Sequence, residues 1–324
     1  MRVIFGIAGT LGAVLFCAVA TAQPPDLQLI LERGRPAVVI VRASSDGGVT
    51  SGTAFFISQD GFALTAAHVA RGRERIVLER GGSQLTAHLV GYDARRDVAL
   101  LRANAPNGLA TLELADSTAV RPGDPVVVIG SPRGRPITWT AGQVLAVDAT
   151  LPGLVPGILI RHNAPIVPGH SGSPLLNAQG QVIGLVIGVS REPGEEGGLA
   201  VASSVIRAIL PHLVAGARLE RAWIGIAGMT VDPELSRRRR LVVTRGVLVL
   251  DVAPGSPAEA AGIRADRQDG PPGDVIVSAD GREITRWEDL LRVLGEREPG
   301  QRLRLGIVRE GTLISVELVL GARP

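Results

Sequence analysis

Short apolar runs, separated by Gly, Pro and Asp, dominate the chain from residue 37 to residue 189. Many short runs at this spacing predict the strands of a sandwich or barrel. Residues 203–214 predict one helix that closes this part of the chain. The runs lie at residues 37–43, 53–58, 84–91, 98–103, 126–130, 143–149, 159–162 and 182–189.

From residue 222 onward the pattern changes to a mixture of helices and strands. Ser256 and Glu259 have the spacing of a capping box, with Pro257 at the first helical position. Thr285 and Glu288 repeat that spacing before a second helix. This region therefore predicts a small α+β module. Its strand-like runs lie at residues 247–252, 274–278, 302–308 and 313–320.

The 324 residues correspond to about two domains. A polar segment of small residues, 215–221, reads as the linker between a domain at 37–214 and a second at 222–324. Residues 23–36 form a separate N-terminal segment, in which Leu27 to Leu31 is too apolar for a solvated tail. We expect that segment to pack on the body or on another subunit.

The first 22 residues have the pattern of a secretory signal. Arg2 precedes an apolar, uncharged stretch, and Ala20-Thr21-Ala22 is a small-residue cleavage site. We expect cleavage after Ala22 and a periplasmic or secreted protein. The alternative is an uncleaved membrane anchor, because about 17 apolar residues are marginal for spanning a bilayer. Cleavage would remove Cys17, the single cysteine.

Composition narrows the candidate chemistry. All 34 basic residues are arginine and the net charge is only +3, so the pI of about 10.2 does not indicate a nucleic-acid partner. The missing lysine excludes Schiff-base chemistry and a P-loop. One cysteine excludes a disulfide framework, and the five histidines show no metal-ligand spacing. We expect no cofactor and no metal.

Three polar residues stand in settings that suit nucleophilic catalysis. Ser171 has a glycine on its C-terminal side and Gly169 two residues before it, which allows a tight turn that exposes the hydroxyl. His68 follows an apolar strand among small alanines, and Asp97 begins another apolar strand. A mostly buried carboxylate needs a partner, and an imidazole N–H is a suitable one.

The chain order separates two classes of serine hydrolase. An α/β-hydrolase has the order Ser, Asp, His, with a glycine two residues after the nucleophile. Here the order is His68, Asp97, Ser171, and residue 173 is serine. That order on a strand-rich chain is the chymotrypsin-like arrangement.

Six short segments carry a more specific signal. They are Ser51–Ile57, Leu64–Val69, Asp97–Leu101, Gly169–Leu175, Trp223–Ile226 and Pro254–Glu259. The part of the chain at about 27–213 resembles the chymotrypsin-like protease domain of the HtrA/Deg family, and about 222–321 resembles its PDZ domain. The resemblance implies a mostly β fold, a double antiparallel β-barrel followed by a small α+β PDZ domain.

The resemblance assigns a role to each candidate residue. It implies that His68 is the general base, Asp97 its orienting partner and Ser171 the nucleophile, with the backbone N–H groups of Gly169 and Ser171 as the oxyanion hole. His170 and Ser173 depart from the family pattern around the nucleophile. Pro165, Ile166 and Val167 would line the S1 pocket, and because they are uncharged we expect an apolar P1 residue, the residue before the scissile bond.

In the second domain the resemblance implies a peptide-binding groove. Trp223, Ile224, Gly225 and Ile226 would bind a peptide's C-terminal carboxylate, and a helix of about 286–294 would form the other wall. Expected partners are unfolded polypeptides, C-terminal peptides and two further copies in a homotrimer. The resulting hypothesis is an ATP-independent serine endopeptidase of envelope protein quality control. The alternative is a catalytically silent peptide-binding scaffold or chaperone.

Overall fold

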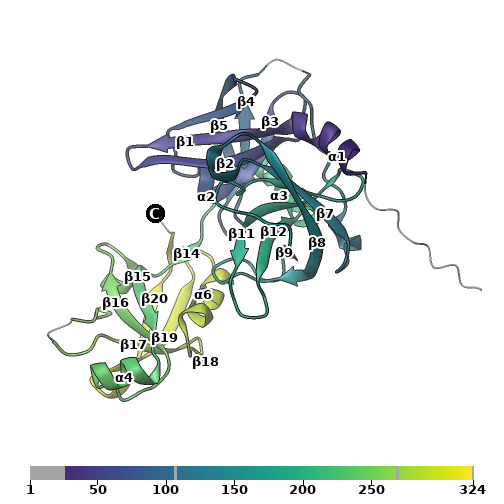
Figure 1. The fold of residues 1–324 in the computed structure, drawn as a ribbon. Helices are drawn as coiled ribbons and strands as arrows, with labels where there is room; N and C mark the ends of the chain where they lie inside the picture. The colour runs from purple at the N-terminus through teal and green to yellow at the C-terminus, as the bar shows by residue number, and fades with distance from the viewer. Residues whose placement is uncertain (1–25, 106–107, 268–269, 323–324) are drawn as a thin grey trace, which may run out of the picture.

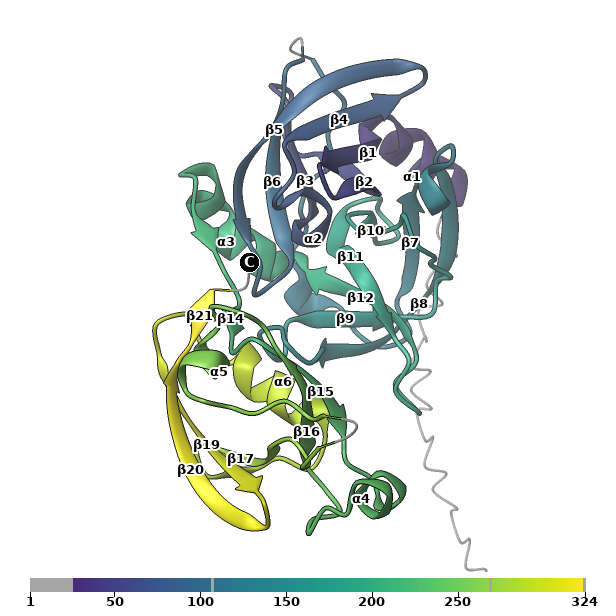
Figure 2. The same cartoon turned by 90° about the vertical axis from the view of Figure 1, so that its left-hand side faces the viewer.

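The computed structural model describes residues 26–105, 108–267 and 270–322 (Figure 1). The predicted signal segment therefore lies outside the described residues. The chain forms two β-barrels packed together, followed by a smaller sheet domain with its own core (Figure 2). The predicted fold class, a double antiparallel barrel followed by a PDZ-like module, is confirmed.

The first barrel has the strand order β5-β4-β1-β2-β3-β6, and pairing between β5 and β6 closes it. Its buried positions are filled by small and branched apolar side chains together with Phe55 and Phe56 of β2, as expected for a barrel whose interior is filled by side chains. The strands are β1 (Val38–Ser45), β2 (Gly48–Phe56), β3 (Phe62–Ala66), β4 (Arg75–Arg80), β5 (Ser83–Asp93) and β6 (Val98–Ala103).

The second barrel closes in the order β10-β11-β12-β9-β8-β7. Its strands are β7 (Pro125–Gly130), β8 (Thr138–Ala149), β9 (Leu159–His162), β10 (Pro174–Leu176), β11 (Val182–Ser190) and β12 (Gly197–Ala202). The helical elements of this part are α1 (Leu27–Gly34), α2 (Ala67–Ala70), α3 (Ser203–Val214) and the short 3₁₀ turns η1 (Arg35–Ala37), η2 (Ser117–Ala119) and η3 (Pro132–Gly134). The helix predicted at residues 203–214 is confirmed.

Helix α1 packs on the second barrel. Ile30 is buried, and Gly34 lies so close to the barrel that an added Cβ would be 2.8 Å from Ile129 and 3.1 Å from Leu176. Leu29 on the same helix stays exposed. The apolar N-terminal segment thus covers the body of its own chain and keeps one apolar residue on the surface.

The C-terminal domain wraps a five-stranded path, β15-β16-β17-β19-β20, with β18 paired to β17, around helix α6. Its elements are β14 (Ala222–Trp223), β15 (Ile226–Thr230), α4 (Pro233–Arg239), β16 (Val247–Val252), α5 (Pro257–Ala260), β17 (Val275–Ala279), β18 (Arg282–Glu283), α6 (Trp287–Gly295), β19 (Arg302–Arg309), β20 (Thr312–Val319) and β21 (Gly321–Ala322).

The two predicted capping boxes have different outcomes. At α5 the Ser256 hydroxyl accepts from the Glu259 N–H at 3.1 Å, and the Glu259 carboxylate accepts from the Gly255 N–H at 2.6 Å. At α6 the prediction that Glu288 completes the capping box is wrong. The Asp289 carboxylate accepts from the backbone N–H groups of Thr285 and Arg286, because the helix begins one residue later than predicted.

The predicted linker takes part in the fold. Within it, β13 (Arg218–Leu219) pairs in parallel with β5 and joins the first sheet. The Gly153 N–H, in the loop between β8 and β9, donates to the Leu291 carbonyl of α6 at 3.1 Å. Arg95 and Glu298 form an ion pair across the same junction. The C-terminal domain is therefore attached through both backbone and side-chain contacts.

Across the residues described, no helix combines the length and the apolar character needed to cross a membrane.

Candidate active site

His68 and Asp97 meet where the paired strands β3 and β6 of the first barrel end and begin. His68 belongs to α2, directly after β3, and Asp97 precedes β6, the strand paired with β3. The Asp97 carboxylate lies 2.6 Å from His68 Nδ1 through Oδ2 and accepts the His68 backbone N–H at 2.9 Å through Oδ1. Asp97 is buried, whereas 44% of the His68 side chain is exposed. One carboxylate thus holds both the ring and the backbone of the histidine and leaves Nε2 accessible.

A strained turn presents Asp97. Its φ is 59°, in the left-handed region that non-glycine residues rarely adopt. The preceding turn is held by buried Asp93, whose carboxylate accepts from the N–H groups of Arg95 and Arg96 at 2.9 and 3.2 Å. The Asp97 carbonyl accepts from Ala67 at 3.1 Å. Such strain, which costs about 1–3 kcal/mol, persists only where neighbouring contacts stabilise it.

Ser171 lies on a turn of the second barrel that the first barrel holds in place. Thr53 on β2 donates its N–H to the Ser171 carbonyl and its hydroxyl to the Gly169 carbonyl, both at 2.8 Å. Gly169 and Gly172 have φ of 100° and 88°. A Cβ at Gly172 would lie 2.0 Å from the Thr53 carbonyl oxygen. Only glycine therefore fits where the two barrels meet.

The same interface places the Ser171 carbonyl and Val69, the residue after His68, on either side of Gly52. A Cβ at Gly52 would lie 2.9 Å from Val69, which follows His68, and 3.1 Å from the Ser171 carbonyl oxygen. In the part of the chain that is described, the Ser171 hydroxyl forms no hydrogen bond, and the N–H groups of Gly169 and Ser171 donate to no protein acceptor. These two amides border the turn on which the hydroxyl sits.

A cavity of about 730 Å³ opens beside Ser171. The three residues predicted for the S1 pocket, Pro165, Ile166 and Val167, all line it. So does His162, a buried residue at the end of β9 that the sequence analysis did not select. In the sequence, His162 ends the apolar run at residues 159–162. A histidine in that position is equally compatible with a place in the core, so the pattern alone does not indicate a role in the site.

The residues predicted to bind a peptide carboxylate also line one cavity. Trp223, Ile224, Gly225 and Ile226 surround a space of about 180 Å³ together with Trp287, Leu291 and Leu294 of α6. The helix predicted as the second wall is therefore in that position. Pro152 and Gly153, from the loop between β8 and β9, also line this cavity.

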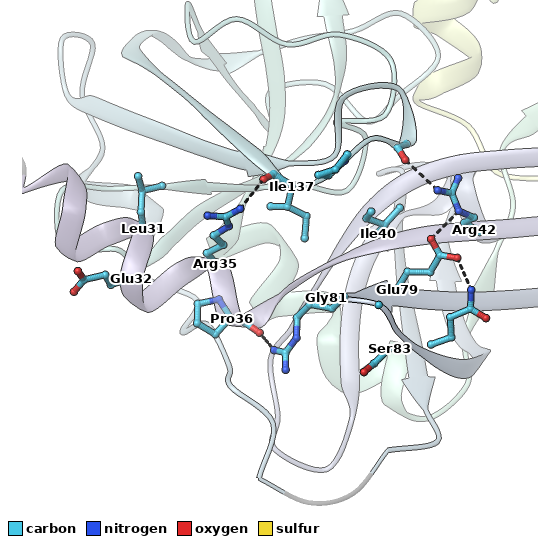
Figure 3. A pocket seen from close by; sticks show the side chains of 15 residues that line it. Leu31, Glu32, Arg35, Pro36, Ile40, Arg42, Glu79, Gly81, Ser83 and Ile137 are labelled. Carbon is cyan, nitrogen blue, oxygen red and sulfur yellow. Dashed lines mark hydrogen bonds and ion pairs between the residues drawn. The ribbon is translucent and has the colours of Figure 1, made fainter.

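A third cavity lies between α1 and the hairpin of β4 and β5, and it contains none of the predicted site residues (Figure 3). Arg42 spans it, with an ion pair to Glu79 at 2.8 Å and a hydrogen bond to the Gly134 carbonyl at 3.0 Å. Leu31 of α1 and Ile137 contribute apolar surface. These polar contacts are internal to the chain and suggest no chemistry.

Comparisons with known proteins agree with this architecture. Residues 52–185 match the trypsin-like peptidase domain, and residues 224–320 match the PDZ domain. The chain thus consists of a trypsin-like peptidase domain followed by a PDZ domain. HtrA- and DegP-type proteases are its homologues, which confirms the resemblance to the HtrA/Deg family.

Curated relatives are described as probable periplasmic DegP-like serine endoproteases. The relative from Pseudomonas fulva strain 12-X is 34% identical over 309 residues, which cover 93% of this chain and 62% of the relative. The relative from Chlamydia muridarum is 34% identical over 277 residues, which cover 84% of this chain and 54% of the relative. This chain therefore spans about three fifths of the length of the curated relatives it matches.

Two solved structures show the same arrangement. The HtrA-type protease AlgW with a decapeptide has a TM-score of 0.59 and 25% identity, covering 91% of this chain and 98% of its own. The serine endoprotease from Yersinia pestis has a TM-score of 0.58 and 26% identity, covering 94% of this chain and its own chain completely.

Proposed function

We propose that this protein is a serine endopeptidase that cleaves peptide bonds through His68, Asp97 and Ser171. The observation that carries the proposal is the double contact of the Asp97 carboxylate with the His68 ring and backbone, beside a serine turn with two unengaged amides. The names of the relatives support the same reaction.

The geometry supports a two-step acyl transfer. Asp97 holds the proton on His68 Nδ1, so the free Nε2 takes the Ser171 hydroxyl proton as Oγ attacks the scissile carbonyl. His68 then donates that proton to the leaving amine, and an acyl-enzyme forms. Water attacks the acyl-enzyme with His68 as base again, releasing the acid and restoring the Ser171 hydroxyl. The hydroxyl-to-imidazole hydrogen bond forms when substrate binds.

We assign the oxyanion hole to the N–H groups of Gly169 and Ser171. Two backbone donors stabilise the negative charge that develops on the carbonyl oxygen in the transition state. Thr53 positions both, because it bonds the carbonyls of the same two residues. No ATP, metal or other cofactor takes part in this reaction scheme.

The test uses a fluorophosphonate probe, which labels an activated serine, and casein as an unfolded substrate. We expect the mature protein to be labelled and to cleave casein, and Ser171→Ala to do neither. Ser83→Ala, at the exposed first residue of β5, serves as the matched control and should behave like the wild type. If the wild type is neither labelled nor active on casein, the alternative of a silent peptide-binding scaffold is favoured.

For the PDZ domain we propose capture of peptide C-termini at Trp223–Ile226, as a strand beside β15. We expect a peptide with a free C-terminus to bind at least about 10-fold more tightly than its amidated form, because charge-assisted hydrogen bonds to backbone N–H groups are lost. Gly225→Ala should abolish this difference, since its Cβ would lie 2.1 Å from the Ser256 Cβ. Gly255→Ala, with open space around it, is the control. Equal affinity of both peptides, measured by calorimetry, would refute carboxylate capture.

The biological setting follows from the same resemblance. Relatives described as periplasmic serine endoproteases support a location in the periplasm. We propose that the protein degrades unfolded or damaged envelope proteins there, as the resemblance to the HtrA/Deg family implies. We also propose a homotrimer, in which exposed Leu29 and the apolar surface at Leu31 and Ile137 contact neighbouring copies. Sedimentation of the mature protein measures this assembly directly.

A further inference from the structure

A buried histidine stands at one wall of the cavity beside Ser171. His162 on β9 pairs with Gly198 on β12, and its side chain is fully buried yet lines the cavity. The ring fills the space that a side chain at residue 198 would take, because a Cβ there would lie 2.3 Å from His162 Cε1. The glycine thus makes room for a fully buried imidazole that borders this cavity.

The polar atoms of this region lack partners. Within the described residues, neither ring nitrogen of His162 makes a hydrogen bond of ordinary geometry, although the Ala164 backbone lies close enough to interact with the ring. His170 Nε2 and Ser173 Oγ also lack hydrogen-bond partners there. His170 also lines the cavity, and a Cβ at Gly130 would touch both Ser173 and His170. Buried polar groups without partners are uncommon and costly. Their concentration behind one pocket indicates a site that a ligand completes.

The surroundings of His162 keep its ring neutral in the free protein. Burial lowers the pKa of His162 to about 4, and a weaker interaction with the Ala164 backbone only partly opposes this shift. A charge on nearby His170 would lower it further. Burial also lowers the pKa of His170, against its contact with the Val167 backbone. A negative group that entered the cavity would oppose this effect of burial and raise both pKa values.

An acidic side chain fits this site better than an apolar one. An apolar P1 residue would leave the buried nitrogens unpaired in the complex. A carboxylate accepts hydrogen bonds from both imidazoles, and its charge is neutralised when His162 takes one proton from solvent. Arg191 and Glu196 also line the cavity, and their opposite charges offset each other. The preference for an acidic or an apolar side chain therefore depends on the two histidines.

We propose that His162, together with His170, recognises the P1 side chain and that the enzyme cleaves after Glu or Asp. The inference rests on the proposed peptidase function and deepens it. It replaces the apolar P1 residue expected from Pro165 and Ile166, which line the same cavity and are less buried than His162.

The test compares peptide substrates that differ only at P1, carrying Glu, Gln, Leu or Val. We expect kcat/KM for Glu to exceed that for Leu by at least about 10-fold, because a site built from hydrogen-bonding groups rejects a residue that leaves them unpaired. His162→Leu should lower kcat/KM for the P1 Glu substrate by about the same factor. It should also raise kcat/KM for the P1 Leu substrate relative to that for P1 Glu. His88→Leu, at an exposed histidine of β5, should keep the wild-type preference. Equal or higher rates for Leu or Val in the wild type overturn the proposal.

Binding and spectroscopy keep the inference testable if the chain does not cleave peptides. With Ser171→Ala, an amidated peptide spanning the site should bind more tightly with P1 Glu than with P1 Leu, and NMR should show the pKa of His162 rising on binding. A histidine that only fills the core would show neither change, and that result overturns the proposal. If folding of His162→Leu fails, His162→Gln replaces it. Fluorophosphonate labelling separately reports whether the proposed peptidase function stands.

Discussion

Replacing Asp97 with Asn is expected to lower kcat/KM by about 10⁴-fold, as loss of the orienting carboxylate does in serine proteases. Both oxygens of Asp97 accept hydrogen bonds from His68, one from the ring and one from the backbone. An amide offers one acceptor and one donor group. If its oxygen keeps the backbone N–H, its NH₂ faces Nδ1 and favours the tautomer with the proton on Nε2, which cannot accept the Ser171 proton.

Steady-state kinetics on a peptide substrate near pH 8 measure this loss, with circular dichroism as the check on folding. Asp148→Asn is the matched control, because Asp148 has a similar left-handed φ of 55° but an exposed side chain. The control should keep nearly full activity. A decrease of less than about tenfold for Asp97→Asn would mean that the carboxylate does not set the tautomer of His68.

Gly172→Ala is expected to destabilise the protease domain by about 2–5 kcal/mol. An added Cβ would lie 2.0 Å from the Thr53 carbonyl oxygen and 2.5 Å from the Thr65 hydroxyl. Forcing extra volume into a packed site costs about 1–3 kcal/mol, and an L side chain in a left-handed conformation costs about 1–2 kcal/mol more. Activity should also fall, since the turn that moves carries Ser171.

Denaturation midpoints in urea test this prediction against Gly123→Ala. Gly123 also has a positive φ, 94°, but no atom lies within 4 Å of its added Cβ. The control therefore isolates the backbone conformational cost of about 1–2 kcal/mol. Equal losses of stability in the two variants would show that the contact between the barrels at Gly172 is not tightly packed.

Local sequence patterns were sufficient for much of the fold. The apolar runs at residues 98–103 and 159–162 coincide with β6 and β9, and residues 203–214 coincide with α3. Strand β10 has only three residues, too few for a pattern to establish. The linker strand β13 was missed for a different reason: its two residues pair with Tyr92 and Asp93, more than a hundred positions earlier.

The sequence by itself determined the residue types, their chain order and the glycines that permit the turn at Ser171. Only the tertiary structure decided which groups meet. It placed Asp97 on both the ring and backbone of His68, bound Thr53 of one barrel to the Ser171 turn of the other, and set His162 against Gly198. Periodicity reports which face of a strand is buried, but pairings between distant strands depend on the register of the closed sheets. The contacts that suggest substrate preference therefore appear only in the folded chain.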